Sequence, residues 1–161
     1  MTTPAAIAVT VTKIIPVPVE RVFDAWLSAK LIGRFMFGPS LRDEEIVRLR
    51  TDGLVDGTFS FVVRRKGQEI NHIGRYLAID RPRHLAFTWG VAPQSGEPGR
   101  VLITLQPTSE GGTQLSLVHE LPAGWEDYIG PVRSAWTKML EMLDAVLRQP
   151  LDTQAEEVVT P

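Results

Sequence analysis

The three histidines of this sequence are its best candidates for acid–base or metal chemistry. They are His72, His84 and His119, and no His-x-His or His-Glu-x-x-His spacing occurs. A divalent metal site needs three or four converging ligands, and zinc sites draw on cysteine and closely spaced histidine. The 161 residues contain no cysteine. The pattern therefore predicts no metal site, and it excludes disulfides and thiol chemistry.

His119 has the most informative surroundings of the three. It alternates with Leu115 and Leu117, so a strand would place all three side chains on one face. That face is expected to be buried, with His119 pointing inward. Two interpretations stay open: a core side chain with one hydrogen-bond partner, or a polar anchor or general base in a cavity. Glu120 falls on the opposite face, and no Gly-x-Ser-x-Gly or phosphate-binding glycine loop occurs, so no catalytic residue is predicted.

Residues 70–79 form a strand pattern whose inward face is ambiguous. One phase would turn Ile73 inward together with Arg75, and the other would turn Tyr76 inward together with Ala78. Burying an unpaired guanidinium costs far more than burying a tyrosine hydroxyl with one hydrogen bond. We expect Arg75 near solvent, although the sequence alone leaves the register open.

The element that must position these side chains is the periodic segment near the C-terminus. Residues 124–149 repeat apolar side chains at helical spacing. The stripe predicts one helix of roughly seven turns, about 36 Å long at 1.5 Å per residue. Pro131 lies early enough to allow a start in that first turn or a mild kink near Ile129.

The rest of the chain reads as one strand, two short helices and a run of strands. The first strand is expected at 7–15, and the short helices at 19–27 and 31–37. Six further segments alternate with period two between turn residues, at 44–50, 58–63, 70–79, 85–89, 101–105 and 113–121. Such an order predicts an α+β helix-grip fold: a curved antiparallel β-sheet wrapped around a long C-terminal α-helix, with two short helices after the first strand.

Length and composition limit the remaining possibilities. The length predicts a single domain, at 7–149, between a flexible N-terminus at 1–6 and a disordered acidic tail at 150–161. Seventeen basic and nineteen acidic residues give a net charge of −2. Without a clustered basic face, nucleic acid is not an expected partner. No signal peptide and no run of eighteen apolar residues is found, which predicts a cytoplasmic protein without integral membrane association.

Four separated motifs then carry a resemblance to a known family. They are VFDAW at 22–26, GRYLAIDRPRHLAFTW at 74–89, GTQLSLVHE at 112–120 and AW at 135–136. In this order they resemble the START-like (SRPBCC, Bet v 1-like) superfamily, in its branch of activator of heat-shock chaperone ATPase homologs. The resemblance covers about residues 8–148. It implies the same helix-grip fold.

The resemblance implies three functions. The favoured one is binding of a small, largely apolar or amphipathic molecule in a cavity between the sheet and the C-terminal helix. The alternatives are a protein-interaction module that stimulates a heat-shock chaperone ATPase, and a cyclase- or hydrolase-type enzyme using His119. The enzyme is less expected because no second converging group is found, and no cofactor is expected. The expected ligand-binding residues are Trp26, Phe35, Phe37, Phe61, Tyr76, Trp89, His119, Tyr128, Val132 and Trp136.

Overall fold

The structure, a computed structural model, describes residues 7–39, 41–92 and 98–148. The expected flexible terminus and acidic tail lie outside these residues. Seven antiparallel strands form one sheet in the order β1-β7-β6-β5-β4-β3-β2. The strands are β1 (Ile7–Ile15), β2 (Glu45–Thr51), β3 (Thr58–Arg65), β4 (Gln68–Asp80), β5 (His84–Val91), β6 (Gly99–Pro107) and β7 (Thr113–Leu121).

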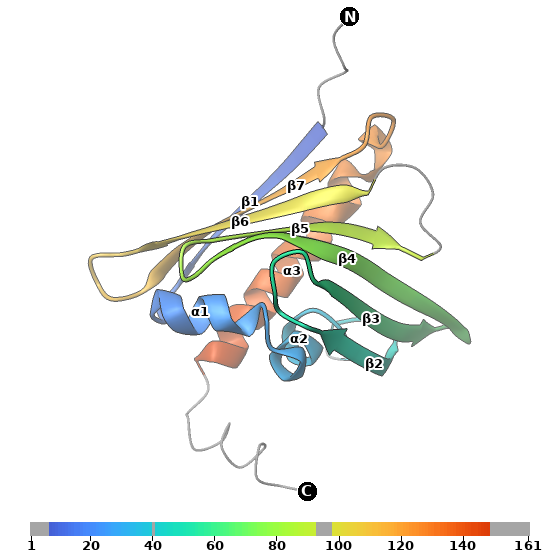
Figure 1. The fold of residues 1–161 in the computed structure, drawn as a ribbon, viewed down its shortest axis with the longest axis horizontal. Coiled ribbons are helices and arrows are strands. Elements are labelled where there is room, and N and C mark those ends of the chain that lie inside the picture. The colour runs from blue at the N-terminus through green and yellow to red at the C-terminus, as the bar shows by residue number, and fades with distance from the viewer. Residues whose placement is uncertain (1–6, 40, 93–97, 149–161) are drawn as a thin grey trace, which may run out of the picture.

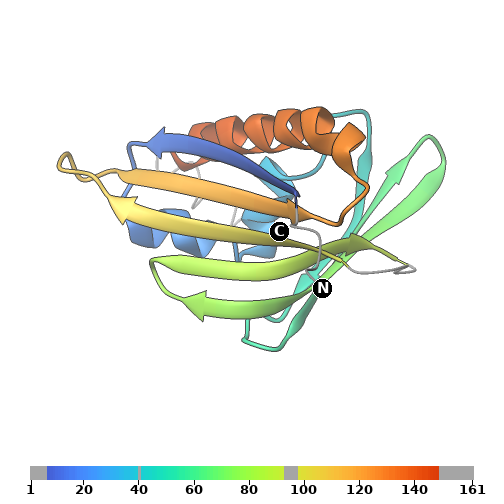
Figure 2. The same ribbon diagram turned by 90° about the horizontal axis from the view of Figure 1, so that it is seen from above.

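Within the described residues, three α-helices cover one face of this sheet. They are α1 (Val19–Ala25), α2 (Ala29–Phe35) and α3 (Ile129–Leu147). The long α3 runs along the concave face of the curved sheet, while α1 and α2 lie together at one end (Figures 1 and 2). Helix α3 packs against β1 and α2, and α2 also contacts β2. This arrangement confirms the predicted α+β helix-grip fold.

The long helix begins later than the stripe predicted. A 3₁₀ turn, Glu126–Tyr128, comes first, and the α-helix begins at Ile129. Pro131 then lies in the first turn, where a backbone N–H would have no intrahelical acceptor. The prediction of one helix from 124 was therefore wrong by about one turn, because proline is tolerated in the first turn and not in a helix interior.

The inward face of β4 follows the phase that we expected. Tyr76 is buried and Arg75 is exposed. The Tyr76 hydroxyl finds its one partner in Thr51 Oγ1, at 2.6 Å. Burial raises the pKa of Tyr76 above its ordinary value. The phenol therefore stays neutral and contributes one directed hydrogen bond within the interior.

Two irregularities bend the sheet at the β2 to β5 end. The pairing of β2 with β3 shifts between Ile46 and Arg48, and the pairing of β4 with β5 shifts between Tyr76 and Ala78. Such shifts mark bulges, which increase the local twist of a strand. Just before the second one, Gly74 lets β5 and the ring of Phe59 approach the β4 backbone closely. Together these features curve the sheet around its contents.

Candidate functional site

Aromatic rings fill the space between the sheet and α3. Trp136 projects from α3 and lies 6.1 Å from Trp26 of the α1 end and 5.8 Å from Trp89 of β5, measured between ring centroids. Trp26 also meets Phe35 edge-on at 5.0 Å. Each ring reaches this point because it occupies a position of its strand or helix whose side chain points toward the interior. The result is one continuous aromatic cluster, to which elements far apart in the sequence contribute.

A small cavity remains inside this aromatic cluster. Its volume is about 10 Å³, which is near the minimum space that one water molecule needs. The residues around it are Trp26, Ile32, Met36, Phe59, Phe61, Tyr76, Phe87 and Trp89. A drug-sized ligand normally occupies several hundred Å³. A bound molecule of that kind would therefore have to displace some of these side chains.

The predicted site residues divide into three groups by position: the cavity wall, the rest of the interior, and the surface. Four of them line the cavity: Trp26, Phe61, Tyr76 and Trp89. Five lie outside its wall and within the buried interior or packed against it: Phe35, Phe37, Val132, Trp136 and His119. Phe37 contacts both Phe61 and Trp89, so it packs against two residues of the cavity wall.

Tyr128 lies away from the cavity. It is 52% exposed, and its ring contacts Trp125 at 4.9 Å. The prediction that it lines the cavity was wrong, because Tyr128 belongs to the 3₁₀ turn that precedes α3 and not to the α-helix that carries Trp136. Four residues of the wall were not predicted: Ile32, Met36, Phe59 and Phe87. The phenylalanines carry a usable signal, since Phe59 and Phe87 alternate with Phe61 and Trp89 at period two.

His119 faces the interior, as its alternation with leucines predicted. It is 5% exposed, and its Nδ1 accepts a hydrogen bond of 2.9 Å from Trp136 Nε1. An indole nitrogen can only donate, so the proton of the neutral imidazole resides on Nε2. Burial lowers the pKa of His119 from 6.5 to about 4. The geometry is that of a paired core histidine, since the ring nitrogen that could receive a proton is occupied by Trp136.

His72 forms a second buried imidazole, with the opposite tautomer. Its Nδ1 lies 3.2 Å from the Phe61 carbonyl oxygen, which can only accept, so Nδ1 carries the proton. Burial lowers the pKa of His72 from 6.5 to about 4. The Phe61 hydrogen bond acts against that shift, and the nearby Arg65 guanidinium adds to it. The ring packs 4.9 Å from Phe37. His72 therefore connects the aromatic cluster to a group of charged side chains beside it.

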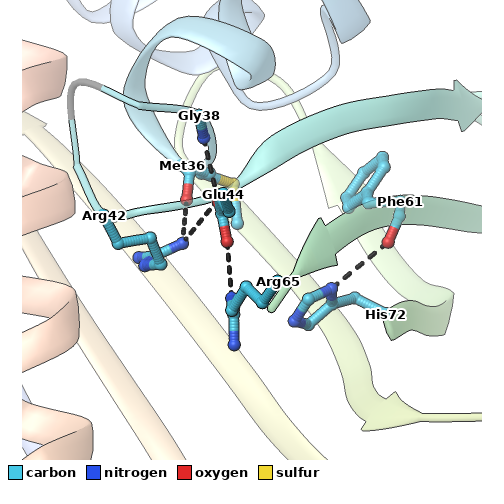
Figure 3. A network of polar contacts seen from close by, with 7 residues as sticks. All are labelled: Met36, Gly38, Arg42, Glu44, Phe61, Arg65 and His72. Carbon is cyan, nitrogen blue, oxygen red and sulfur yellow. Dashed lines mark hydrogen bonds and ion pairs between the residues drawn. The ribbon is translucent and has the colours of Figure 1, made fainter. Parts of the chain in front are cut away.

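That charged group centres on the carboxylate of Glu44, which is fully buried. Its Oε2 accepts from the backbone N–H of Gly38 at 2.8 Å and from Arg42 at 3.1 Å, and its Oε1 accepts from Arg65 at 2.6 Å. Arg42 also donates to the carbonyl of Met36. Figure 3 shows both guanidinium groups pointing toward the carboxylate. The network ties the loop after α2 to the end of β3, next to the cavity wall.

Replacing Glu44 is expected to loosen this connection. Glu44→Gln removes the charge while keeping the shape, so we expect a loss of about 2 to 4 kcal/mol in the free energy of unfolding. Urea titration followed by circular dichroism measures it. The control is Glu45→Gln, whose partner Arg64 is exposed and whose effect should stay within about 0.5 kcal/mol. Equal effects of the two substitutions would contradict a structural role for the Glu44 network.

Two features of the described residues bear on other classes of function. No group of three or more His, Cys, Asp or Glu side chains in this part of the chain could hold a metal ion. None of the helices that the structure describes has the length and apolar character that crossing a membrane requires.

Comparison with known proteins identifies relatives of this architecture. A family model described as Activator of Hsp90 ATPase homolog 1-like protein matches residues 16–148. No curated protein gives a significant match. The solved structure of protein CV1439 from Chromobacterium violaceum is similar with a TM-score of 0.75 and 22% identity, covering 89% of this chain and 99% of that one.

Two further solved structures share the fold. Protein NE0264 from Nitrosomonas europaea has a TM-score of 0.76 at 19% identity, over 92% of this chain and 99% of that one. CalU16 from Micromonospora echinospora has a TM-score of 0.66 at 22% identity, over 92% and 80%. At these identities the likeness concerns the fold, and function has to be argued from the site itself.

Proposed function

Because this chain belongs to the activator of Hsp90 ATPase homolog 1-like family, we propose that it binds a small, largely apolar molecule between its sheet and α3. Proteins on this START-like fold commonly bind ligands or interact with chaperones. The observation that carries the proposal is the cavity inside the aromatic cluster, whose wall is almost entirely apolar. A few polar groups, such as the Tyr76 hydroxyl, lie among the rings.

The size of the cavity limits how a ligand would be held. The cavity has a volume of about 10 Å³, so the surrounding rings would have to move apart before a ligand fits. Trp89 is the one half-buried residue of its wall, so entry on that side disturbs the core least. Burying about 300 Å² of apolar ligand surface at ~25 cal/mol per Å² gives roughly 7 kcal/mol before association costs. Affinity is therefore expected to be modest.

Native mass spectrometry of freshly purified protein tests the proposal. We expect a fraction of the protein to carry an additional mass that organic extraction releases. Naphthalene added to stripped protein is expected to raise its melting temperature, because a ligand that binds only the folded state stabilises it. Absence of both the bound mass and the naphthalene effect would overturn the proposal.

A cavity-filling variant shows whether binding occurs at this place. Met36 lines the cavity and is buried, so Met36→Phe should abolish the naphthalene effect at a cost of about 1 to 3 kcal/mol in stability. The matched control is Leu77→Phe, at a position that is 41% exposed, where the naphthalene effect should persist. Calorimetric titration of both variants measures the difference. Persistent binding by Met36→Phe would place the ligand elsewhere.

A second candidate function is interaction with a chaperone, and one observation favours it. Trp125 and Tyr128, 46% and 52% exposed, lie just before α3 with their rings tilted against each other and their centroids 4.9 Å apart. Exposed tyrosine and tryptophan are enriched where proteins bind one another. The test is the ATPase rate of a purified Hsp90-type chaperone with and without this protein. Stimulation that is lost when both residues become alanine, at unchanged melting temperature, would support it, and no stimulation would contradict it.

The enzyme interpretation has no such observation behind it. His119 pairs with Trp136, and a catalytic histidine would need an orienting partner and a reachable substrate proton. We propose no reaction. The cytoplasmic location stays a prediction from the sequence.

A further inference from the structure

The indole nitrogen of Trp26 is a buried hydrogen-bond donor without a partner. Trp26 is 3% exposed and lines the cavity. Its Nε1 has no hydrogen-bond partner among the residues that the structure describes. A buried N–H without an acceptor loses the hydrogen bond it makes to water in the unfolded chain, which destabilises the folded state. An unpaired donor in a native core therefore requires an explanation.

Two other polar groups of the aromatic cluster have hydrogen-bond partners. Trp136 Nε1 donates to His119, and the Tyr76 hydroxyl pairs with Thr51. The ring of Phe35 meets Trp26 edge-on, and an N–H contact with a ring face is much weaker than a hydrogen bond to oxygen. Among the fully buried side-chain N and O atoms of the described residues, the one without a partner on a cavity residue is Trp26 Nε1, and it calls for an acceptor.

The surroundings determine the charge of that acceptor. Apart from Tyr76, the wall consists of hydrocarbon, thioether and indole groups, so an ionised carboxylate would be buried without a counter-charge, at high cost. The guanidinium groups of Arg42 and Arg65, described above, are already bound to Glu44 and offer no counter-charge. A neutral oxygen such as a ketone, ester or ether fits, because it accepts one hydrogen bond and carries no charge.

We propose that the ligand of this protein is an apolar molecule with a neutral carbonyl or ether-type oxygen, which accepts a hydrogen bond from Trp26 Nε1. This inference rests on the proposed function and narrows its ligand class. Trp26 supplies the single directed contact, and the surrounding rings supply the apolar contact area. Such a division between one polar anchor and an apolar wall is typical of small-molecule sites.

The test compares two probes of nearly equal shape, 2-acetylnaphthalene and 2-isopropylnaphthalene, by calorimetric titration. The quantity measured is the ratio of their affinities, in the unaltered protein and in Trp26→Phe, which keeps a ring and removes the donor. We expect the ratio to shift against the ketone by about tenfold or more in the variant, as for a lost buried hydrogen bond. Because a general effect on packing would change both affinities alike, the change in their ratio reports the loss of the N–H donor.

Each outcome bears on the inference. If both probes bind and the ratio is the same in the two proteins, the donor has no role and the inference fails, while apolar ligand binding stands. If neither probe binds, this inference fails, and the bound mass and the naphthalene effect decide on the proposed function. If Trp26→Phe does not fold, a measurement on the unaltered protein replaces it. The NMR signal of the Trp26 indole N–H proton should then shift downfield with the ketone and not with the hydrocarbon. The same shift with both probes would also overturn the inference.

Discussion

Lowering the pH from 7 to 4 is expected to remove several kcal/mol from the free energy of unfolding of this protein. The cause is the pair of buried histidines, His72 and His119, whose pKa values burial lowers from 6.5 to about 4. Both imidazoles are neutral in the folded protein at pH 7. In the unfolded chain each would take up a proton below pH 6.5, and in the folded protein only near pH 4.

The direction of the effect follows from proton linkage. Between pH 6.5 and about 4 the unfolded chain binds more protons than the folded protein, so stability falls as the pH falls. The contribution is fully present above pH 6.5 and is lost by about pH 4. A pKa difference of this size corresponds to about 3 kcal/mol for each histidine. Together the two approach the total stability of many domains, about 5 to 15 kcal/mol.

Urea titrations at several pH values between 7 and 4 measure this loss. His72→Gln and His119→Gln should each reduce the slope of stability against pH in that interval, and the double variant should reduce it further. Each variant is compared with the unaltered protein at the same pH, since losing the contacts to Phe61 or Trp136 also lowers stability at pH 7. An unchanged slope in both single variants would show that these side chains are not the groups that resist protonation.

Gly74→Ala is expected to be the most damaging single-methyl change in this sheet. A Cβ at this position would lie 2.1 Å from the backbone oxygen of Thr88 and 2.3 Å from Cζ of Phe59. The oxygen belongs to β5 and cannot move without separating two strands. We expect a loss of about 3 to 5 kcal/mol in the free energy of unfolding, above the usual cost of overpacking.

The control for this change is the same substitution in an open position. Gly130 lies in the first turn of α3, where an added Cβ meets nothing within 4 Å. Gly130→Ala should therefore stabilise the protein by about 0.4 to 1 kcal/mol, because it restricts the unfolded chain. Thermal unfolding of the two variants measures the contrast. Similar melting temperatures would mean that β4 and β5 are farther apart at Gly74 than the structure places them.

The sequence predicted the elements well where a periodic pattern was long. The strands at 7–15 and 113–121 have the bounds that their alternation indicated, and the inward phase of Tyr76 followed from the cost of burying Arg75. Both are local arguments about one face of one strand. The start of α3 was missed, because apolar spacing continues through Trp125 and Tyr128 although the backbone there is not α-helical.

The candidate site was less predictable, because it depends on side chains that are distant in the sequence. Glu44 reaches Arg65, 21 residues away, and no spacing rule connects the two. The cavity volume is the small remainder after many rings have packed, so a sequence pattern can name the rings and cannot give the space between them. The unpaired nitrogen of Trp26 is likewise visible only once every neighbouring acceptor has a position.

The bulge in β2 also bears on how this protein behaves at high concentration. Strand β2 is an edge of the sheet, and its exposed residues include the apolar Ile46 and Val47. A flat edge of that composition would offer its free N–H and C=O groups to the same edge of another molecule. The register shift between Ile46 and Arg48 breaks that row, and the charges of Glu45 and Arg48 flank it. We therefore expect this edge to resist strand-to-strand self-association, the first step of amyloid-type aggregation.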